Sequence, residues 1–336
     1  TYAIVIAAFI ACQVLISTGA MTRSLKGQLV PICAYVVMAV SLNLTVGISG
    51  ELSLGHAGFM SVGAFSGIVM AMWLSKGVGV ENQTLCLLLA ILTGGVAAGI
   101  AGVIIGIPVL RLRGDYLAIV TLAFGEIIRN VINCLYISLD GQSLHIAFNN
   151  PNVPGKLLVN GPAGATGVTK IATFGMGFAL VLFTLFVVLN LIDSRSGRAI
   201  MAIRDNRIAA EAMGLNVTKY KMMAFVTSAV LAGMAGALYG LNFSTVAASK
   251  FKFDTSILVL VFVVLGGIGN IRGSIISATL LTILPELLRA FANYRMLIYA
   301  IVLILVMLAT NNPTLRSLVQ RIIPHKKVQK KEADEA

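Results

Sequence analysis

The stretch TVGISGELSLGHAGFMSVGA, residues Thr45–Ala64, determines the architecture that this sequence predicts. It is rich in glycine and serine, separates two long apolar runs, and carries Glu51 and His56. Non-helical backbone persists inside a hydrocarbon layer only where protein or water satisfies its N–H and C=O groups. A broken apolar segment with polar residues at the break is therefore a candidate substrate path. The alternative is a short loop between two spanning helices.

The composition outside this stretch is that of a membrane protein. The chain has 336 residues, of which 58% are hydrophobic and only 11% are charged. A soluble globular chain carries roughly 25% charged residues, and the apolar runs here have the ~20-residue length of membrane-spanning helices. We therefore predict an all-α polytopic membrane protein, with one transmembrane domain over residues 1–336 and about eight to ten spanning helices.

A second Gly-rich interruption, LGGIGNIRGSIISA at Leu265–Ala278, follows in the other half of the chain. Corresponding breaks in two halves are typical of an internally repeated transporter core. Gly267 and Gly269 begin a dinucleotide-like fingerprint, but Arg272 replaces its third glycine and no βαβ context surrounds it. The sequence also contains no phosphate-binding loop, no H-E-x-x-H motif and no G-x-S-x-G motif. We predict that the chain is not an enzyme and binds no cofactor or metal of its own.

The net charge of +12 is segregated along the chain. Six basic residues lie within residues 193–221, and six more lie within residues 311–336. Such clusters predict a cytoplasmic segment and a basic cytoplasmic tail that faces anionic lipid. No aromatic-basic stacking surface accompanies them, so nucleic acid is not an expected partner. Residues 138–170 contain only two lysines and several turn signals made of asparagine, glycine and proline, and we predict an external loop there.

Residues 193–221 predict two short helices on the cytoplasmic side. Ser194 or Ser196 is positioned to cap the first, Asn206 to cap the second, and Gly214 to end the second in a left-handed conformation. Short amphipathic helices at a membrane surface lie flat in the headgroups or bind a partner.

Two other patterns concern the spanning helices themselves. Glycines at three- and four-residue intervals predict close helix packing; they are Gly95, Gly99, Gly102 and Gly106 in one run and Gly233, Gly236 and Gly240 in another. Glu126 and Arg129 are spaced to pair on one helix face within an apolar run. Ionisable residues inside a membrane are functional candidates, although a neutralised pair is also compatible with a structural role.

Several stretches together resemble one family. RLRGDYLAIVTLAFGEIIRNVI (Arg111–Ile132), the two Gly-rich breaks, and SRSGRAIMAIRDNRIAAEAMGLNVTKYKMMAFVTSA (Ser194–Ala229) resemble elements of the LivM-type permeases of branched-chain amino acid ABC importers, in family order. The resemblance covers nearly the whole chain. Residues 149–156 depart from it, and this portion is where differences between binding-protein partners are expected to reside.

The resemblance implies a permease subunit of the bacterial inner membrane without an ATPase of its own. Its implied partners are a paralogous LivH-type permease, two ABC ATPase subunits that bind the ATP, an extracytoplasmic amino-acid-binding protein, and membrane lipid. The ATPase-coupling residues implied by the resemblance are Arg198, Arg204, Arg207, Glu211 and Gly214. The alternative for this segment is a merely solvated charged helix.

The function expected from this resemblance is import of leucine, isoleucine and valine by alternating access. The alternatives are the same machine carrying urea or short amides, a passive channel for a small polar solute, and a structural subunit without a path. The residues expected along the substrate path are Ser49, Gly50, Glu51, Ser53, His56, Gly266, Gly267, Gly269 and Asn270.

Overall fold

The computed structural model describes residues 2–18, 23–112, 114–141, 143–150 and 154–288, and a few positions between 297 and 304. The predicted cytoplasmic tail, residues 311–336, lies outside the described residues, as does most of a last helix predicted at residues 295–309. Residues 1–283 form one compact unit, and residues 284–336 form a second.

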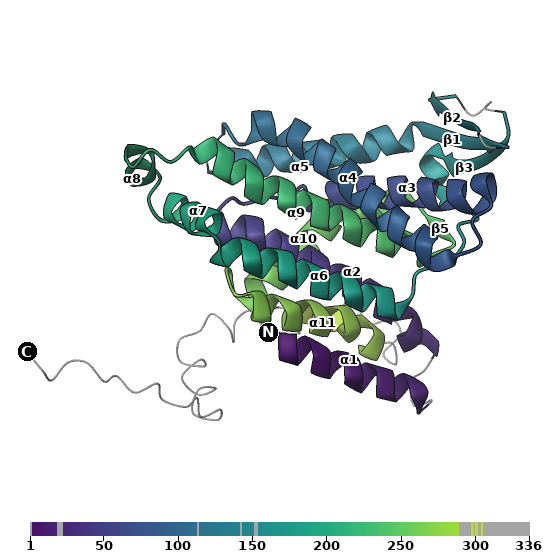
Figure 1. Ribbon diagram of the computed structural model, residues 1–336, viewed down its shortest axis with the longest axis horizontal. Helices are drawn as coiled ribbons and strands as arrows, with labels where there is room; N and C mark the ends of the chain where they lie inside the picture. The colour runs from purple at the N-terminus through teal and green to yellow at the C-terminus, as the bar shows by residue number, and fades with distance from the viewer. Residues whose placement is uncertain are drawn as a thin grey trace, which may run out of the picture. The chain divides into compact units, whose positions relative to one another are not determined.

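The described chain is mostly helical, as predicted (Figure 1). Its α-helices are α1 (Tyr2–Ser17), α2 (Arg23–Asn43), α3 (His56–Met72), α4 (Gln83–Val109), α5 (Asp115–Asn133), α6 (Phe174–Asp193), α7 (Arg195–Asp205), α8 (Arg207–Ala212), α9 (Val217–Gly240), α10 (Phe253–Gly266) and α11 (Ile271–Leu287). Two π-helical segments, Leu44–Ile48 and Trp73–Val78, extend α2 and α3. Within the described residues, six helices are long and apolar enough to cross a membrane. They comprise α2 and α3 with their π-helical extensions, and α4, α5, α6 and α9.

Helix α9 is the centre of the packing and lies against α3 and α4 through glycines. A Cβ on Gly63 would overlap the backbone of Gly233, and a Cβ on Gly236 would overlap the carbonyl of Met60. On α4, Gly102 lies against Ala229 of α9. These contacts confirm the predicted packing role of the glycine stripes. Helices in a bilayer gain little from expelling water, so close backbone approach is what holds them together.

We expect Gly236→Ala to destabilise the protein, because the added methyl group has no space between α9 and α3. Overpacking of a well-packed core costs about 1–3 kcal/mol. The matched control is Gly175→Ala on α6, since a Cβ there meets no atom within 4 Å. Thermal unfolding in detergent should give a lower midpoint for Gly236→Ala and an unchanged midpoint for Gly175→Ala. Equal midpoints for both variants would contradict the packing role.

The first Gly-rich stretch is a re-entrant segment rather than a simple loop. His56, the first residue of α3, lies beside Ser228, with 3.0 Å between Nε2 and Oγ. Ser228 is eleven residues beyond Val217, the first residue of α9, and therefore lies about 16 Å from that end of α9. Helix α3 thus begins beside the interior of α9 and not beside its end. Residues 49–55 are non-helical and connect the end of α2 to this internal starting point. The chain therefore turns back inside the membrane domain before it continues as α3.

A small sheet occupies the region where the sequence predicts only an external loop. Strands β1 (Leu135–Asp140), β2 (Ser143–Phe148), β3 (Lys156–Asn160), β4 (Ala165–Thr166) and β5 (Thr245–Val246) form one antiparallel sheet in the order β2-β1-β3-β4-β5. The fold is thus not entirely α. The turn signals were interpreted correctly as turns, but short strands separate them and pair across the loop. Figure 1 shows the sheet and α8 at opposite ends of the helices.

Candidate functional site

The two Gly-rich breaks, far apart in the sequence, meet in the structure. The side-chain Oδ1 of Asn43 accepts a hydrogen bond from the backbone N–H of Gly269 at 2.8 Å. The Nδ2 of the same side chain donates to Ser274 Oγ, also at 2.8 Å. A Cβ on Gly47 would overlap Gly269, so the two backbones are in direct contact. One buried amide side chain thereby joins the end of α2 to the start of α11.

The second break is a tight turn between α10 and α11. Gly267 and Gly269 have φ angles of 92° and 83°, which L side chains rarely adopt. Gly266 packs directly on Gly273, and neither position has space for a Cβ. Asn270 caps α11, because its Oδ1 accepts from Gly273 N–H at 3.2 Å. The predicted interruption is confirmed, and its glycines are needed for the turn itself.

The polar side chains of the first break face the protein interior. His56 is fully buried, and its Nε2 lies 3.3 Å from Ser41 Oγ and 3.0 Å from Ser228 Oγ. Ser53 is also buried, and its hydroxyl has no hydrogen-bond partner among the described residues. The backbone of this break is satisfied from outside it, because Leu54 N–H donates to Thr121 Oγ1 at 3.0 Å.

Glu51 has a definite partner at the start of α9. Its carboxylate pairs with the ammonium of Lys221, and both side chains are largely covered. Ser49 lies in the last turn of the π-helical segment, where its N–H donates to Leu44 C=O at 3.1 Å. Glu51 thus holds the broken stretch against α9.

Arg204 connects the predicted coupling segment to the first break. Its Nη1 donates to the carbonyl of Gly47 at 2.9 Å, and the same guanidinium bonds Asp205. The side chain of Arg204 also lies against Gly50. Arg204 of α7 therefore contacts the point where the two breaks meet, although Gly47 lies 157 residues earlier in the chain.

The coupling segment has the predicted local structure. Ser194 caps α7 through Gly197 N–H, and Asn206 caps α8 through Ala209 N–H. Gly214 follows α8 with a φ of 81° and ends it as predicted. Arg198 donates to the carbonyl of Asp193 at 3.0 Å and so completes the end of α6.

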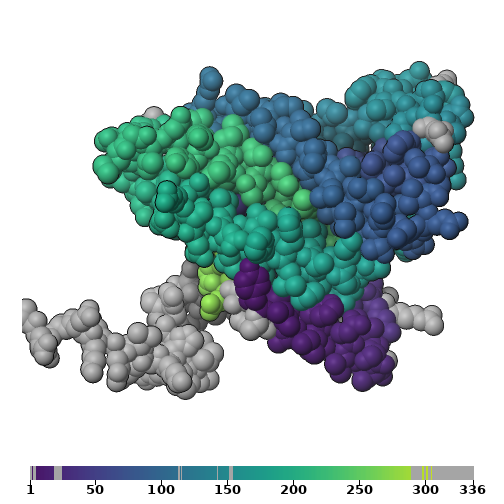
Figure 2. Space-filling view, in the orientation of Figure 1, coloured from purple at the N-terminus to yellow at the C-terminus, as the bar shows by residue number. Residues whose placement is uncertain are grey.

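Helix α8 presents a mixed surface at one end of the protein. Arg207 and Glu211 form an ion pair at 2.9 Å along the helix. Beside them, Ile208 is 81% exposed and Met213 is 83% exposed. In the space-filling view the residues of α7 and α8 lie at the end away from the sheet (Figure 2). The charged residues of this segment were predicted from the sequence, but Ile208 and Met213 were not. Their importance depends on their exposure, which only the structure shows.

A small core holds α7, α8 and the start of α9 together. It consists of Ile203, Ala210 and Val217, with Leu215 and Tyr220 packed against them. Because these side chains come from all three elements, a displacement of α8 is transmitted to α7 and α9.

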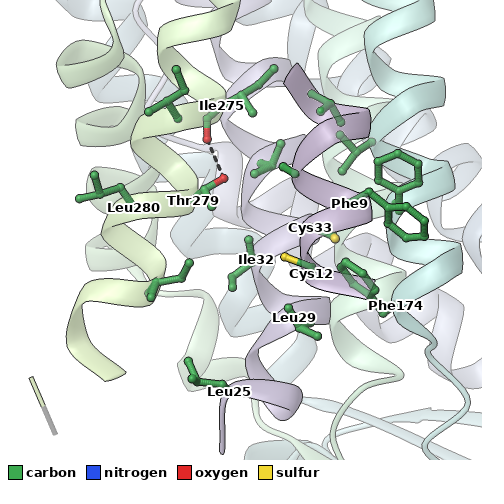
Figure 3. A pocket seen from close by; sticks show the side chains of 17 residues that line it. Phe9, Cys12, Leu25, Leu29, Ile32, Cys33, Phe174, Ile275, Thr279 and Leu280 are labelled. Carbon is green, nitrogen blue, oxygen red and sulfur yellow. Dashed lines mark hydrogen bonds between the residues drawn. The ribbon is translucent and has the colours of Figure 1, made fainter. Parts of the chain in front are cut away.

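An apolar cavity of about 350 Å³ lies between α1, α2, α6 and α11 (Figure 3). Aromatic and aliphatic side chains dominate its lining, including the stacked rings of Phe9 and Phe174. Cys12, Cys33 and Thr279 are its more polar members, and Thr279 Oγ1 already donates to Ile275 C=O at 2.8 Å. Such a lining suits hydrocarbon, and it offers no charged group to a polar solute.

The sequence thus located both breaks and the two short helices α7 and α8, but not the residues that connect them. Those missed are Ser41, Asn43, Thr121, Ser228, Ser256 and Ser274. Asn43 and Ser41 were detectable in principle, as polar residues within an otherwise apolar run. The assignment of the break residues to a substrate path stays a prediction.

Comparison with known proteins gives consistent matches. A family model described as the permease component of a branched-chain amino acid transport system matches residues 25–307. The chain is 34% identical over 308 residues to the high-affinity branched-chain amino acid transport system permease protein LivM of Salmonella typhimurium, covering 82% of this chain and 66% of that protein.

Two further relatives are more distant. The ribose import permease protein RbsC of Escherichia coli K12 is 28% identical over 287 residues, covering 82% of this chain and 81% of that protein. The permease protein LivH of Salmonella typhimurium is 26% identical over 293 residues, covering 82% of this chain and 88% of that protein. The chain spans slightly less than two thirds of the length of its LivM relative. No solved structure matches the chain.

Proposed function

This chain belongs to the family of permease components of branched-chain amino acid transport systems, and we propose that it forms part of the path of an ATP-driven importer for leucine, isoleucine and valine. It is a multi-pass protein of the inner membrane and not an enzyme. We propose that separate ATPases drive this importer, that a binding protein delivers the solute, and that the solute is a branched-chain amino acid.

The observation that carries the proposal is the physical connection between α8 and the two breaks. Helix α8 offers an exposed surface, the small core joins it to α7, and Arg204 of α7 bonds the carbonyl of Gly47. Asn43 continues the connection to Gly269 in the second break. A passive channel has no use for such a connection, whereas an importer driven from outside its own chain requires one.

We propose for this chain the partners that its family resemblance implies. ATP is bound by two separate ATPase subunits, which dock on α8 from the cytoplasm. A paralogous permease of the LivH type completes the membrane path, in keeping with the similarity of this chain to a protein named LivH. An extracytoplasmic binding protein delivers the amino acid at the opposite end, where the sheet lies.

Uptake of radiolabelled leucine tests this proposal in cells that carry the permease with its genomic neighbours. We expect uptake that is competed by isoleucine and valine and lost with an ATPase partner that cannot hydrolyse ATP. Ribose and urea serve as alternative labelled solutes, ribose because one relative is named for its import. ATPase-dependent uptake of either in place of leucine would contradict the proposed solute. Leucine flux that persists without ATP hydrolysis would contradict the proposed mechanism.

A further inference from the structure

An ion pair lies within the spanning helix α5, in the half that ends at Asn133. The carboxylate Oε2 of Glu126 is 2.6 Å from Nη2 and 2.7 Å from Nε of Arg129. Glu126 is eleven residues from Asp115 and seven from Asn133, which places it about 16 Å and about 10 Å from the two helix ends. Glu126 therefore lies well inside the span, and Arg129 lies one turn nearer to the end at Asn133, about 6 Å from it.

The pair is also incompletely covered by the protein. The Glu126 side chain is 33% exposed and that of Arg129 is 23% exposed. Only 22% of the apolar span of α5 is buried, against 67% for α9. Charged side chains exposed to hydrocarbon are costly, and those found inside membranes face other protein or a water-filled cavity. The open side of α5 beside this pair therefore faces a polar space or another protein rather than lipid.

The adjoining side of α5 is fixed to the first break. Leu54 N–H donates to Thr121 Oγ1 at 3.0 Å. Gly58 and Gly125 bring the two backbones together, since a Cβ on Gly58 would lie 3.0 Å from the Cα of Gly125. Glu126 is the next residue of α5, so movement of the first break is transmitted to the ion pair.

A small pocket lies between Glu126 and the start of α10. Glu126 lines it together with Leu54, Lys252 and Ser256. Ser256 is itself bonded to the first break, because its Oγ accepts from Ala57 N–H at 3.1 Å. Polar groups of α5 and α10 thus converge next to the first break.

We propose that Glu126 and Arg129 form a contact site for the ammonium and carboxylate groups of a transported amino acid. Without substrate the two side chains neutralise each other. A zwitterion entering from the open side of α5 places its ammonium on Glu126 and its carboxylate on Arg129, so the total charge in the site does not change. This inference rests on the proposed function, which supplies the amino-acid substrate and the second permease that faces α5 across the path.

Transport by the complete complex in proteoliposomes, with binding protein and ATPases, tests the assignment. We expect Glu126→Gln and Arg129→Gln each to lower the leucine uptake rate at least tenfold while ATP hydrolysis by the assembled complex continues. The double variant Glu126→Arg/Arg129→Glu keeps an ion pair but reverses its polarity toward the substrate, and we expect it to remain defective. Uptake at the wild-type rate in the single variants, or restored by the double variant, would overturn the proposal.

Water access supplies an independent measurement. In a variant whose native cysteines are replaced by alanine, Glu126→Cys should react with a water-soluble methanethiosulfonate. Ile104→Cys on α4 is the control, because Ile104 is 65% exposed on an apolar helix and should face lipid. Equal protection of both positions from the reagent would overturn the assignment. A wild-type complex that hydrolyses ATP without importing leucine would instead refute the proposed function, and with it the substrate class of this site.

Discussion

Replacing both Ile208 and Met213 by aspartate is expected to abolish co-purification of the ATPase subunits. These two side chains are more than 80% exposed on and just after a six-residue helix, at the end of the protein that we propose faces the cytoplasm. Exposed apolar side chains beside charges are typical of the centre of a protein–protein interface. Two buried, unpaired carboxylates would oppose that contact, so we expect the affinity to fall at least tenfold, or about 1.4 kcal/mol.

A matched control exists on the external sheet. Ile146 and Phe148 of β2 are 63% and 64% exposed, and they lie at the opposite end of the molecule from α8. The Ile146→Asp/Phe148→Asp variant should retain the ATPases at the wild-type level. Membrane insertion of both double variants should be normal, because none of the four side chains is buried. Normal co-purification of the Ile208→Asp/Met213→Asp variant would show that the docking surface lies elsewhere.

Gly47→Ala is expected to reduce leucine uptake at least tenfold in a complex that still binds its ATPases. The added methyl group would overlap both Asn43 Oδ1 and the backbone N of Gly269. The two breaks must then separate, and the Asn43–Gly269 hydrogen bond is lost. The α8 surface is unchanged by this substitution, so ATP hydrolysis should continue while the amount of leucine carried per ATP falls.

Gly27→Ala is the control for this variant. Gly27 lies on the same helix, α2, and a Cβ there meets no atom within 4 Å. Its transport and ATPase activities should match the wild type. The informative quantity is the ratio of leucine uptake to ATP hydrolysis in reconstituted complexes. A Gly47→Ala protein with an unchanged ratio would refute the role of the joined breaks in coupling.

Features that depend on neighbouring residues were predictable from the sequence alone. The caps of α7 and α8 at Ser194 and Asn206, and the stop at Gly214, were predictable because each acts within one helical turn. The glycine stripes were predictable because a spacing of three and four residues fixes one helix face. Both interruptions were visible for the same reason, since glycine and polar residues disturb an apolar run locally.

Which distant segments meet became known only from the three-dimensional structure. Asn43 bonds Gly269 across 226 residues, and Arg204 reaches Gly47 across 157. Neither contact leaves a periodic signal, because each depends on how separate helices are placed. The pairing of β4 with β5 escaped prediction in the same way, since its two strands are two residues each and come from separate external segments. Local spacing specified the helices and their interruptions, whereas long-range packing specified how the interruptions connect to the coupling segment.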